Sequence, residues 1–440
     1  MTVESKTSKF QQLIELVRSH DIAKRFVSGS AWNFFCSVMA KAMVMIAGIY
    51  CARFLGKELY GQYEMVKSTI SNFVVIGGGG LAMAATKYIA EFRNNNRERT
   101  ASIYLLTNYF AVGLALVLAV LMYVLAEELS IGLLETPSLV PMIKLSAIVM
   151  FIVVINTAQD GVLTGFEDFK ARALNLIVSN FVQSALVMAG AYYYGLPGAV
   201  AGYGVGFLFL TLFNLRSVGI DLKRFKIPLR REYIRKSDIK LLFSYFLPAL
   251  FSTLLAAPTF WIIRLLLVRF VDFEAQADYA VADHWRTLVL FIPVAVSQIL
   301  LPILSSEGSK NVRKFWKILN WTLLINASIA AAVALVVIVG KDFIVSLYGS
   351  GFNDSMPLVL LTIACVFNTM SQVLGIAISS LARMWQWFVF NVLWAIVAIG
   401  FTYYFLKNGW GASGAALAVL ISYIWHAIIQ YIYIKITIRE

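Results

Sequence analysis

The sequence predicts an all-α, polytopic membrane protein with about 12 transmembrane helices. Hydrophobic residues make up 60% of the 440 residues and charged residues 14%, whereas soluble domains average roughly 45–50% apolar and about 25% charged residues. Apolar stretches of about 20 residues, enough to cross a ~30 Å hydrocarbon core, recur along the whole chain. Lysine and arginine gather in alternate loops, as expected when those loops are cytoplasmic.

Twelve apolar stretches mark the predicted helices, and each is about long enough to span the membrane. They lie near residues 28–52, 66–90, 101–126, 142–164, 173–194, 199–219, 241–268, 286–304, 315–340, 356–381, 387–406 and 414–434.

The distribution of basic residues predicts the orientation. With a cytoplasmic amino terminus, the inner segments hold 25 of the 37 Lys and Arg residues and the outer segments hold six. This asymmetry places both termini in the cytoplasm. The net charge of +13 therefore describes loops beside anionic lipid and favours no nucleic-acid partner.

Three weak matches at nearly one offset in residue number predict two repeats. The residue types of Arg53, Phe54 and Tyr63 occur again 216 residues later in the chain, and so do those of Glu91, Asn95 and Arg97. The stretch "GLPGAVAG" resembles "GWGASGAA", which begins 214 residues later. Six spans per repeat give parallel repeats around a central cavity. The predicted domains are an amphipathic cytoplasmic segment at 1–27, with no cleavable signal peptide, an N-lobe at 28–219, a basic linker at 220–240, a C-lobe at 241–434 and a cytoplasmic tail at 435–440.

Four consecutive glycines, Gly77, Gly78, Gly79 and Gly80, interrupt the second span. The next lysine, Lys87, lies seven residues beyond Gly80, so the spacing of a phosphate-binding P-loop is absent. Close packing of a neighbouring helix is the favoured role, a hinge is the second, and direct phosphate contact is the third. The three cysteines lie in apolar segments without CxxC spacing, so neither a disulfide framework nor a metal site is expected.

Several motifs resemble a known family. The stretch "ARFLGKELYGQYEM", the glycine-rich second span, "TKYIAEF" and "SQILLPILSSEGSK" are similar to flippases for lipid-linked polysaccharide repeat units. These belong to the multidrug, oligosaccharidyl-lipid and polysaccharide (MOP) exporter superfamily, and the resemblance covers essentially the whole chain. It implies two six-helix lobes of the MATE-like kind around a central cavity. It also implies a bacterial inner-membrane transporter, acting on an undecaprenyl-pyrophosphate-linked oligosaccharide such as an O-antigen unit of lipopolysaccharide. A polysaccharide polymerase and a chain-length regulator are the partners to be sought.

Lys41 is the strongest candidate for binding an anionic head group. It lies nine residues from Trp32 and twelve before Arg53, which places it more than about 10 Å from either membrane boundary. A lysine at such a depth faces an aqueous cavity or an ionic partner. A cavity ligand is favoured, and a structural ion pair with Asp160 is the alternative.

Other basic residues near the spans are weaker candidates. Arg264 lies four or five residues from the outer end of the seventh span, where substrate contact and snorkelling to the surface are about equally expected. Lys67, Lys87 and Lys144 lie nearer to boundaries, and snorkelling is favoured. Pro248 and Pro258 are expected to kink the seventh helix and make it a moving part.

Three titratable residues are candidates for coupling transport to an H⁺ or Na⁺ gradient. Asp160 lies inside the fourth span, and Asp283 with His284 opens the eighth. Intramembrane carboxylates and histidines often form proton relays. The alternatives are that Asp160 pairs with Lys41 or neighbours of Gln159, and that Asp283 is an outer-loop carboxylate. No cofactor is expected.

Two other functions remain open. A drug or cation antiporter of the same superfamily would need an acidic or aromatic cavity, whereas the charges within the spans are mainly basic. A membrane glycosyltransferase would have to use Asp272 and Glu274, which lie in a short predicted loop without a second catalytic cluster. The sequence therefore favours a transporter over an enzyme.

Overall fold

The computed structural model describes residues 21–297, 300, 304, 312–381 and 383–438, and within them every regular element is helical. The predicted segment 1–27 lies mostly outside the described residues. The first half of the chain forms α2 (Asp21–Leu55), α3 (Lys57–Val74), η1 (Val75–Gly79), α4 (Gly80–Phe92), α5 (Arg97–Val124), η2 (Glu128–Leu133), η3 (Pro137–Leu139), α6 (Val140–Phe166) and α7 (Phe169–Arg224). The second half forms η4 (Arg231–Tyr233), α8 (Lys236–Thr253), α9 (Ala256–Phe270), α10 (Phe273–Val289), α11 (Phe291–Ser297), α13 (Val312–Val339), α14 (Lys341–Ser346), α15 (Met356–Ser380), α16 (Met384–Lys407) and α17 (Gly411–Thr437).

Ten helical segments in the described part of the chain are long and apolar enough to cross a membrane. One of them, α7, contains two crossings, because the backbone leaves the helical region at Gly195 (φ 62°) and the two arms pack on each other. Gly190 faces Gly198, and Gly202 faces Leu186. The successive helices α8 and α9 supply one more crossing. The described residues thus contain twelve crossings, the number predicted, and the protein is a multi-pass membrane protein.

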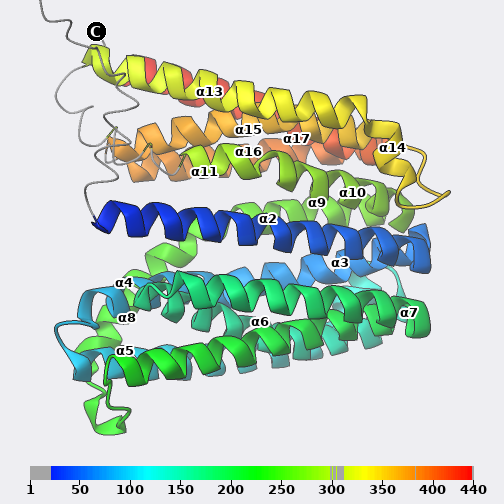
Figure 1. The fold of residues 1–440 in the computed structure, drawn as a ribbon. Coiled ribbons are helices and arrows are strands. Elements are labelled where there is room, and N and C mark those ends of the chain that lie inside the picture. Colours follow the sequence, from blue (N-terminus) through cyan, green and yellow to red (C-terminus); the bar gives the residue numbers. More distant parts are fainter. Residues whose placement is uncertain (1–20, 298–299, 301–303, 305–311, 382, 439–440) are drawn as a thin grey trace, which may run out of the picture.

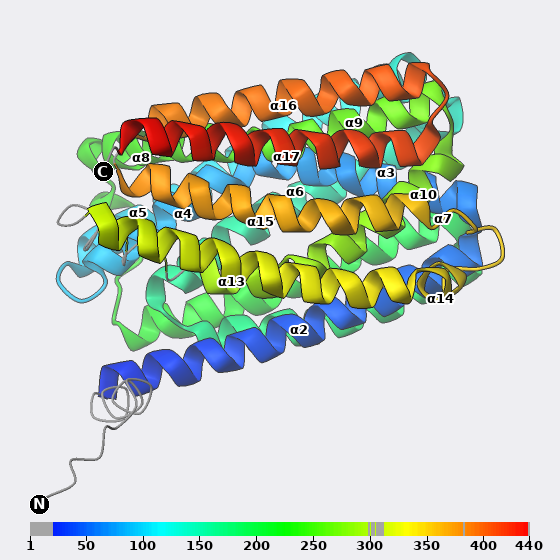
Figure 2. The same cartoon turned by 90° about the horizontal axis from the view of Figure 1, so that it is seen from above.

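The long helices run side by side, and the chain turns alternately at two ends of the bundle (Figures 1 and 2). One end carries Gly195 and α14, and we call it the Gly195 end. The opposite end carries the loop after Arg224, the start of α2 and the end of α17 (Figure 2), and we call it the Arg224 end.

The two repeats are visible in corresponding contacts. Gly195 and Gly411 both have positive φ, 62° and 55°. A Cβ built on Gly198 would lie 2.7 Å from Tyr194, and one built on Gly414 would lie 2.6 Å from Trp410. Each of these residues is related to its counterpart by an offset of 216, so the predicted offset of 214 for this loop is wrong, and a single offset fits all three matches.

One helix of the predicted C-lobe, α8, contacts the N-lobe. It packs on α4 and α5, with Leu242 in their shared apolar core. By contrast, α9 packs mainly on α16 of the C-lobe, and it also contacts α10 and α3. We therefore use N-lobe for α2–α7 and C-lobe for α9–α17, with α8 attached to the N-lobe.

The predicted kink in the seventh crossing is a break between Thr253 and Ala256. Pro258 is the third residue of α9, and its nitrogen cannot donate to the carbonyl of Leu254. The break follows from this missing bond. In contrast, α8 continues through Pro248 to Thr253, so no break occurs there.

The glycine run allows close helix packing, as favoured from the sequence. A Cβ on Gly77 would lie 2.7 Å from Leu118 of α5, and one on Gly80 would lie 2.6 Å from the Phe246 carbonyl oxygen of α8. The same run contains the π-helical turn η1, Val75–Gly79. Such turns are local irregularities that often occur at functional sites, so packing and a locally altered helix occur together here.

Candidate functional site

A cavity of 360 Å³ lies between the two lobes. Its walls come from α2 and α7 on one side and from α10 and α11 on the other. The polar or aromatic residues among its lining are Ser37, Lys41, Asn180, His284, Thr287 and Phe291. The cavity therefore combines cationic, hydroxyl and amide groups with an apolar wall.

Lys41 lines this cavity, as predicted for a cavity ligand. It lies 14 residues before Leu55, the end of α2, or about 20 Å at the usual helical rise. Its ammonium lies 5.4 Å from the ring centroid of Phe291. Within the described residues it forms no ion pair. A lysine so placed offers its charge to whatever enters the cavity.

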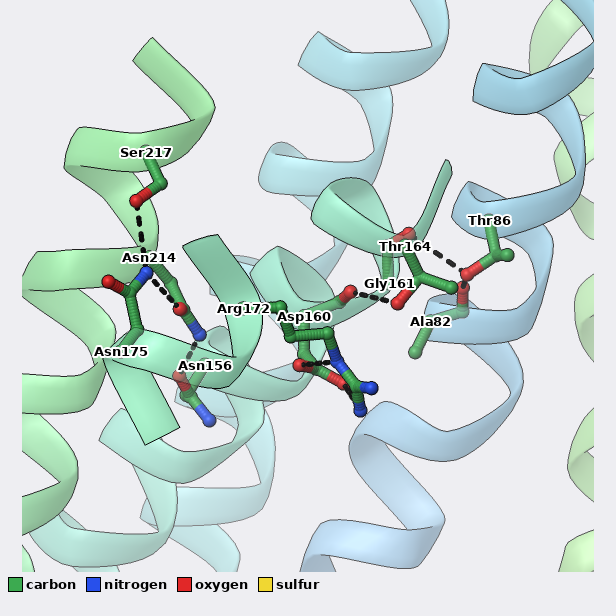
Figure 3. Close-up of polar contacts among 10 residues, drawn as sticks. All are labelled: Ala82, Thr86, Asn156, Asp160, Gly161, Thr164, Arg172, Asn175, Asn214 and Ser217. Atoms are coloured by element: carbon green, nitrogen blue, oxygen red, sulfur yellow. Dashed lines mark hydrogen bonds and ion pairs between the residues drawn. The ribbon is translucent and has the colours of Figure 1, made fainter. Parts of the chain in front are cut away.

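Asp160 is not the partner of Lys41, so that alternative is wrong. Both oxygens of Asp160 accept hydrogen bonds from Arg172, at 2.6 Å and 2.8 Å (Figure 3). This bidentate pair joins α6 to the first arm of α7 inside the N-lobe. Its side chains are each 36% exposed. Asp160 is thus held by a residue that follows closely in the sequence, and its coupling role remains only a prediction.

Three amides beside this pair form a closed network in the N-lobe (Figure 3). Asn175 donates to Asn214 at 2.9 Å and to Ser217 at 3.0 Å. Asn214 donates in turn to Asn156 at 3.0 Å. These bonds tie α6 to both arms of α7.

The lobes meet closely near the Gly195 end, where α3 packs on α10. These helices start at that end and are repeat equivalents. A Cβ on Gly61 would overlap the carbonyl oxygen of Phe273, so glycine is needed for this approach. Lys57 Nζ lies 2.9 Å from Asp278 Oδ2 across the same interface. We call this contact between α3 and α10 the outer seam.

Buried charges continue the outer seam toward the cavity. Glu64 is 2% exposed and pairs with Lys67 at 2.7 Å and with His284 at 3.2 Å. His284 also lines the cavity. Since the Glu64–His284 pair is ionic only when the imidazole is protonated, it is a charge-sensitive link between the lobes.

The structure contradicts two interpretations of the sequence, namely that Asp283 is an outer-loop carboxylate and that Arg264 snorkels to the surface. Asp283 does not open a span but lies ten residues inside α10, so it is not an outer-loop carboxylate. It pairs with Arg264 at 2.7 Å and with Arg286 at 2.6 Å. Arg264 is 7% exposed and therefore does not snorkel. This triad holds α9 against α10, and Arg264 does not line the interlobe cavity.

The remaining predicted lysines differ in their surroundings. Lys67 is not at a helix boundary, because α3 already begins at Lys57. Lys87 is exposed and lies over the rings of Tyr88 and Tyr245, at 4.8 Å and 4.6 Å. Lys144 Nζ lies 3.5 Å from Glu127 in an exposed pair. None of these three lines the interlobe cavity.

Sequence reasoning missed Glu64 and Asn180. The apolar pattern predicts a loop at Glu64, because its charged neighbours hide the start of the helix from a search for apolar stretches. A helical pattern of apolar residues, Tyr60, Tyr63 and Met65 among them, would have extended the span. Asp272, considered above as catalytic, caps α10 by accepting from the Ala275 backbone N–H at 2.7 Å, which is a structural role.

Two further cavities lie outside the interlobe space. An apolar groove of 280 Å³ is formed by residues of α4, α5 and α8, among them Phe110, Phe243 and Phe246. A more polar cavity of 590 Å³ lies inside the C-lobe, between α15, α16 and α17. No cluster that could hold a metal ion occurs in the described part of the chain.

Comparisons with known proteins agree with this geometry. The profile of the family described as "polysaccharide biosynthesis protein" matches residues 26–307. The EPS I polysaccharide export inner membrane protein EpsE of Ralstonia solanacearum is 22% identical over 414 residues, which cover 90% of this chain and 91% of EpsE. The lipid III flippase of Escherichia coli (strain K12) is 22% identical over 407 residues, covering 90% and 94%.

A solved structure shows the same fold. It is the inward-facing conformation of a multidrug resistance MATE family transporter of the MOP superfamily, which superposes with a TM-score of 0.72 at 15% identity. The match covers 91% of this chain and 94% of that one. The predicted MATE-like fold is therefore confirmed.

Proposed function

The chain belongs to the polysaccharide biosynthesis protein family, and from this premise we propose that it is a flippase for a polyprenyl-pyrophosphate-linked oligosaccharide. In this proposal it is a transporter of the bacterial inner membrane and not an enzyme. It moves its substrate from the cytoplasmic to the periplasmic leaflet, as one step in the synthesis of a surface polysaccharide such as O-antigen. The EpsE and lipid III flippase relatives, matched over most of their length, support this class of substrate.

The observation that carries the proposal is Lys41 in the interlobe cavity. A pyrophosphate that leaves water loses the hydration of its negative charges, and a nearby ammonium compensates part of that loss. Lysine suits this role because it binds phosphate as a point charge. No Asp or Glu lines this cavity among the described residues. An anionic head group therefore fits better than the cationic substrate of an antiporter.

The basic loops support an orientation with the Arg224 end in the cytoplasm. The outer seam then closes the periplasmic side, and the interlobe cavity belongs to an inward-facing state. The break between α8 and α9 separates a segment that packs on the N-lobe from one that packs on the C-lobe. Rocking of the lobes would bend the chain at Leu254 and Leu255, open the outer seam and expose the cavity to the periplasm.

Coupling to H⁺ is proposed to act through His284 and Glu64 rather than through Asp160. A protonated His284 attracts Glu64 and strengthens the outer seam, whereas a neutral one weakens it. Lys67 lies in α3 with Glu64 and pairs with it in either state, so it compensates the buried carboxylate without adding to the link between the lobes. The carboxamide variant Glu64→Gln should make transport insensitive to a proton gradient, and an unchanged dependence on the gradient would refute this coupling.

The first test uses intact cells. Deleting the gene should cause one polyprenyl-pyrophosphate-linked oligosaccharide to accumulate on the cytoplasmic side, which extraction and mass spectrometry would identify. Accumulation of no lipid-linked sugar, together with new drug sensitivity, would instead favour the antiporter. Co-purification with a polymerase or a chain-length regulator would add the proposed partners.

The second test concerns Lys41 alone. Lys41→Arg should retain partial transport, whereas Lys41→Ala and Lys41→Glu should lose most of it at normal membrane abundance. Because Asp160 is paired with Arg172, the added change Asp160→Ala should not rescue Lys41→Ala. Full activity of the alanine variant would contradict the role of Lys41.

A further inference from the structure

The C-lobe cavity stands where the N-lobe has its closed amide network. At the repeat offset of 216, Asn156, Asn175 and Asn214 correspond to Gln372, Asn391 and Gln430. These three C-lobe amides come from α15, α16 and α17. Their bonds differ from those of the N-lobe amides. Gln372 donates to Asn368 and Asn391 to the Trp387 carbonyl, each within one helix, and Gln430 lies 2.7 Å from His426.

The C-lobe amides therefore do not fill the space between their helices. A cavity of 590 Å³ remains, and Gln372 and Asn391 line it. This volume falls within the range of pockets for small molecules, roughly 300–1,000 Å³. It reaches from Met384, at the Arg224 end of α16, to Trp394, ten residues and about 15 Å farther along the helix.

Two polar atoms at this cavity have no partner among the described residues. They are Trp394 Nε1 and His426 Nδ1. The two residues are only 3% and 4% exposed, and both line the cavity. Buried donors and acceptors without partners are rare and unfavourable, and an indole N–H usually finds an acceptor. Both atoms are covered by neighbouring groups, so a ligand with hydroxyl groups would supply the missing partners only after a shift of the indole or imidazole ring.

The lining also restricts the chemistry of the ligand. It contains no Asp, Glu, Lys or Arg among the described residues, so it offers no counter-ion to a phosphate or to a cation. It presents amides and hydroxyls together with the aromatic residues Trp387, Trp394 and Tyr423. Trp394 and Tyr423 lie with ring centroids 5.2 Å apart. A polyprenyl tail would prefer the apolar groove beside α5 and α8.

We propose that the C-lobe cavity binds an uncharged sugar residue of the lipid-linked oligosaccharide. A pyranose ring has hydroxyl groups for Gln372, Asn391 and the two unpartnered atoms, and it has C–H faces that pack against indole rings. The inference rests on the proposed function, and it separates two parts of the substrate. The interlobe cavity holds the pyrophosphate, and the C-lobe holds a sugar. Because Ala256, the first residue of α9, also lines the cavity, sugar binding would occur beside the break between α8 and α9.

The test compares two lipids on the full-length protein in nanodiscs. One is the polyprenyl-pyrophosphate-linked oligosaccharide extracted from the deletion strain, and the other is the same polyprenyl pyrophosphate without sugar. Gln372→Ala and Asn391→Ala should weaken binding of the sugar-bearing lipid about tenfold and change binding of the sugar-free lipid less than twofold. Lys41→Gln, the matched control in the interlobe cavity, should weaken both.

The outcomes separate the two proposals. If the wild-type protein binds neither lipid, the flippase proposal fails. If it binds both lipids equally well, or if the C-lobe variants keep full affinity or lose affinity for both lipids alike, the sugar site is refuted. Trp387→Leu, a change at a half-buried position of the cavity, should also weaken binding of the sugar-bearing lipid and leave binding of the sugar-free lipid nearly unchanged. Agreement between this variant and the amide variants would show that their loss of binding does not come from a folding defect. Gel filtration of each variant verifies its fold.

Discussion

Asn175 in the N-lobe and Asn391 in the C-lobe occupy corresponding positions of the two repeats, but their amide groups have different partners. Asn175 donates to two side chains on the second arm of α7. Asn391 donates to Trp387 in its own helix. The N-lobe interior is thus closed by hydrogen bonds between helices, whereas the corresponding interior of the C-lobe is hollow.

This difference shows that duplicated positions can have different roles. Hydrogen bonds between helices stabilise a membrane bundle, because lipid offers no alternative partner. The N-lobe uses its amides in this way. The C-lobe lacks such bonds at three equivalent positions, as expected if a ligand with hydroxyl groups forms hydrogen bonds in their place. The comparison predicts effects on stability in one lobe and effects on binding in the other.

The largest effect on stability is expected at the centre of the N-lobe network. Asn214→Ala removes two hydrogen bonds and leaves the buried Asn156 without its donor. We expect the free energy of unfolding to fall by about 2–3 kcal/mol. Reversible unfolding of the purified protein in detergent would measure this change.

The control is Asn391→Ala, at the C-lobe position that corresponds to Asn175. Its amide is half-buried and bonds only within α16, so a loss below about 0.5 kcal/mol is expected. Equal losses for the two variants would remove the distinction between a structural lobe interior and a binding one.

A smaller effect is expected for the pair beside the network. Arg172→Ala breaks the bidentate bond to Asp160, but both side chains are 36% exposed, so solvent screening should limit the loss to about 1 kcal/mol. Substrate flipping in proteoliposomes should continue. A variant that folds normally but no longer transports would return Asp160 to the list of coupling residues.

The smallest effect is expected outside both interiors. Lys144 and Glu127 form an exposed pair at 3.5 Å. Lys144→Ala should change the free energy of unfolding by less than about 0.5 kcal/mol. A larger loss, measured by the same unfolding experiment, would mean that stability differences between the lobes cannot be assigned to the amide network.

The sequence predicted the fold well because hydrophobic stretches and basic loops are local signals. Twelve crossings and the place of Lys41 followed from them, and the two repeats followed from matching residues in corresponding loops. The ion pairs did not, because Glu64 and His284 lie in different halves of the sequence and meet only when α3 packs on α10. Because the start of α3 is polar, the apolar pattern places the beginning of this span too late and Lys67 at its boundary. The C-lobe cavity was not predicted, because no sequence pattern indicates that the side chains of neighbouring helices do not contact each other.

Transport by rocking of the two lobes requires the outer seam to open. Lys57→Cys with Asp278→Cys, in a chain whose native Cys36, Cys51 and Cys365 are replaced by Ser, places two thiols across that seam. A short, reducible thiol linker should join them and hold the inward-facing state. The control joins Glu127→Cys to Lys144→Cys within the N-lobe.

The decisive measurement is flipping of the lipid-linked oligosaccharide in proteoliposomes before linking, after linking and after reduction. Linking the seam should stop flipping, reduction should restore it, and the control linkage should have no effect. Full flipping by protein whose seam is verified to be linked would contradict alternating access through this interface.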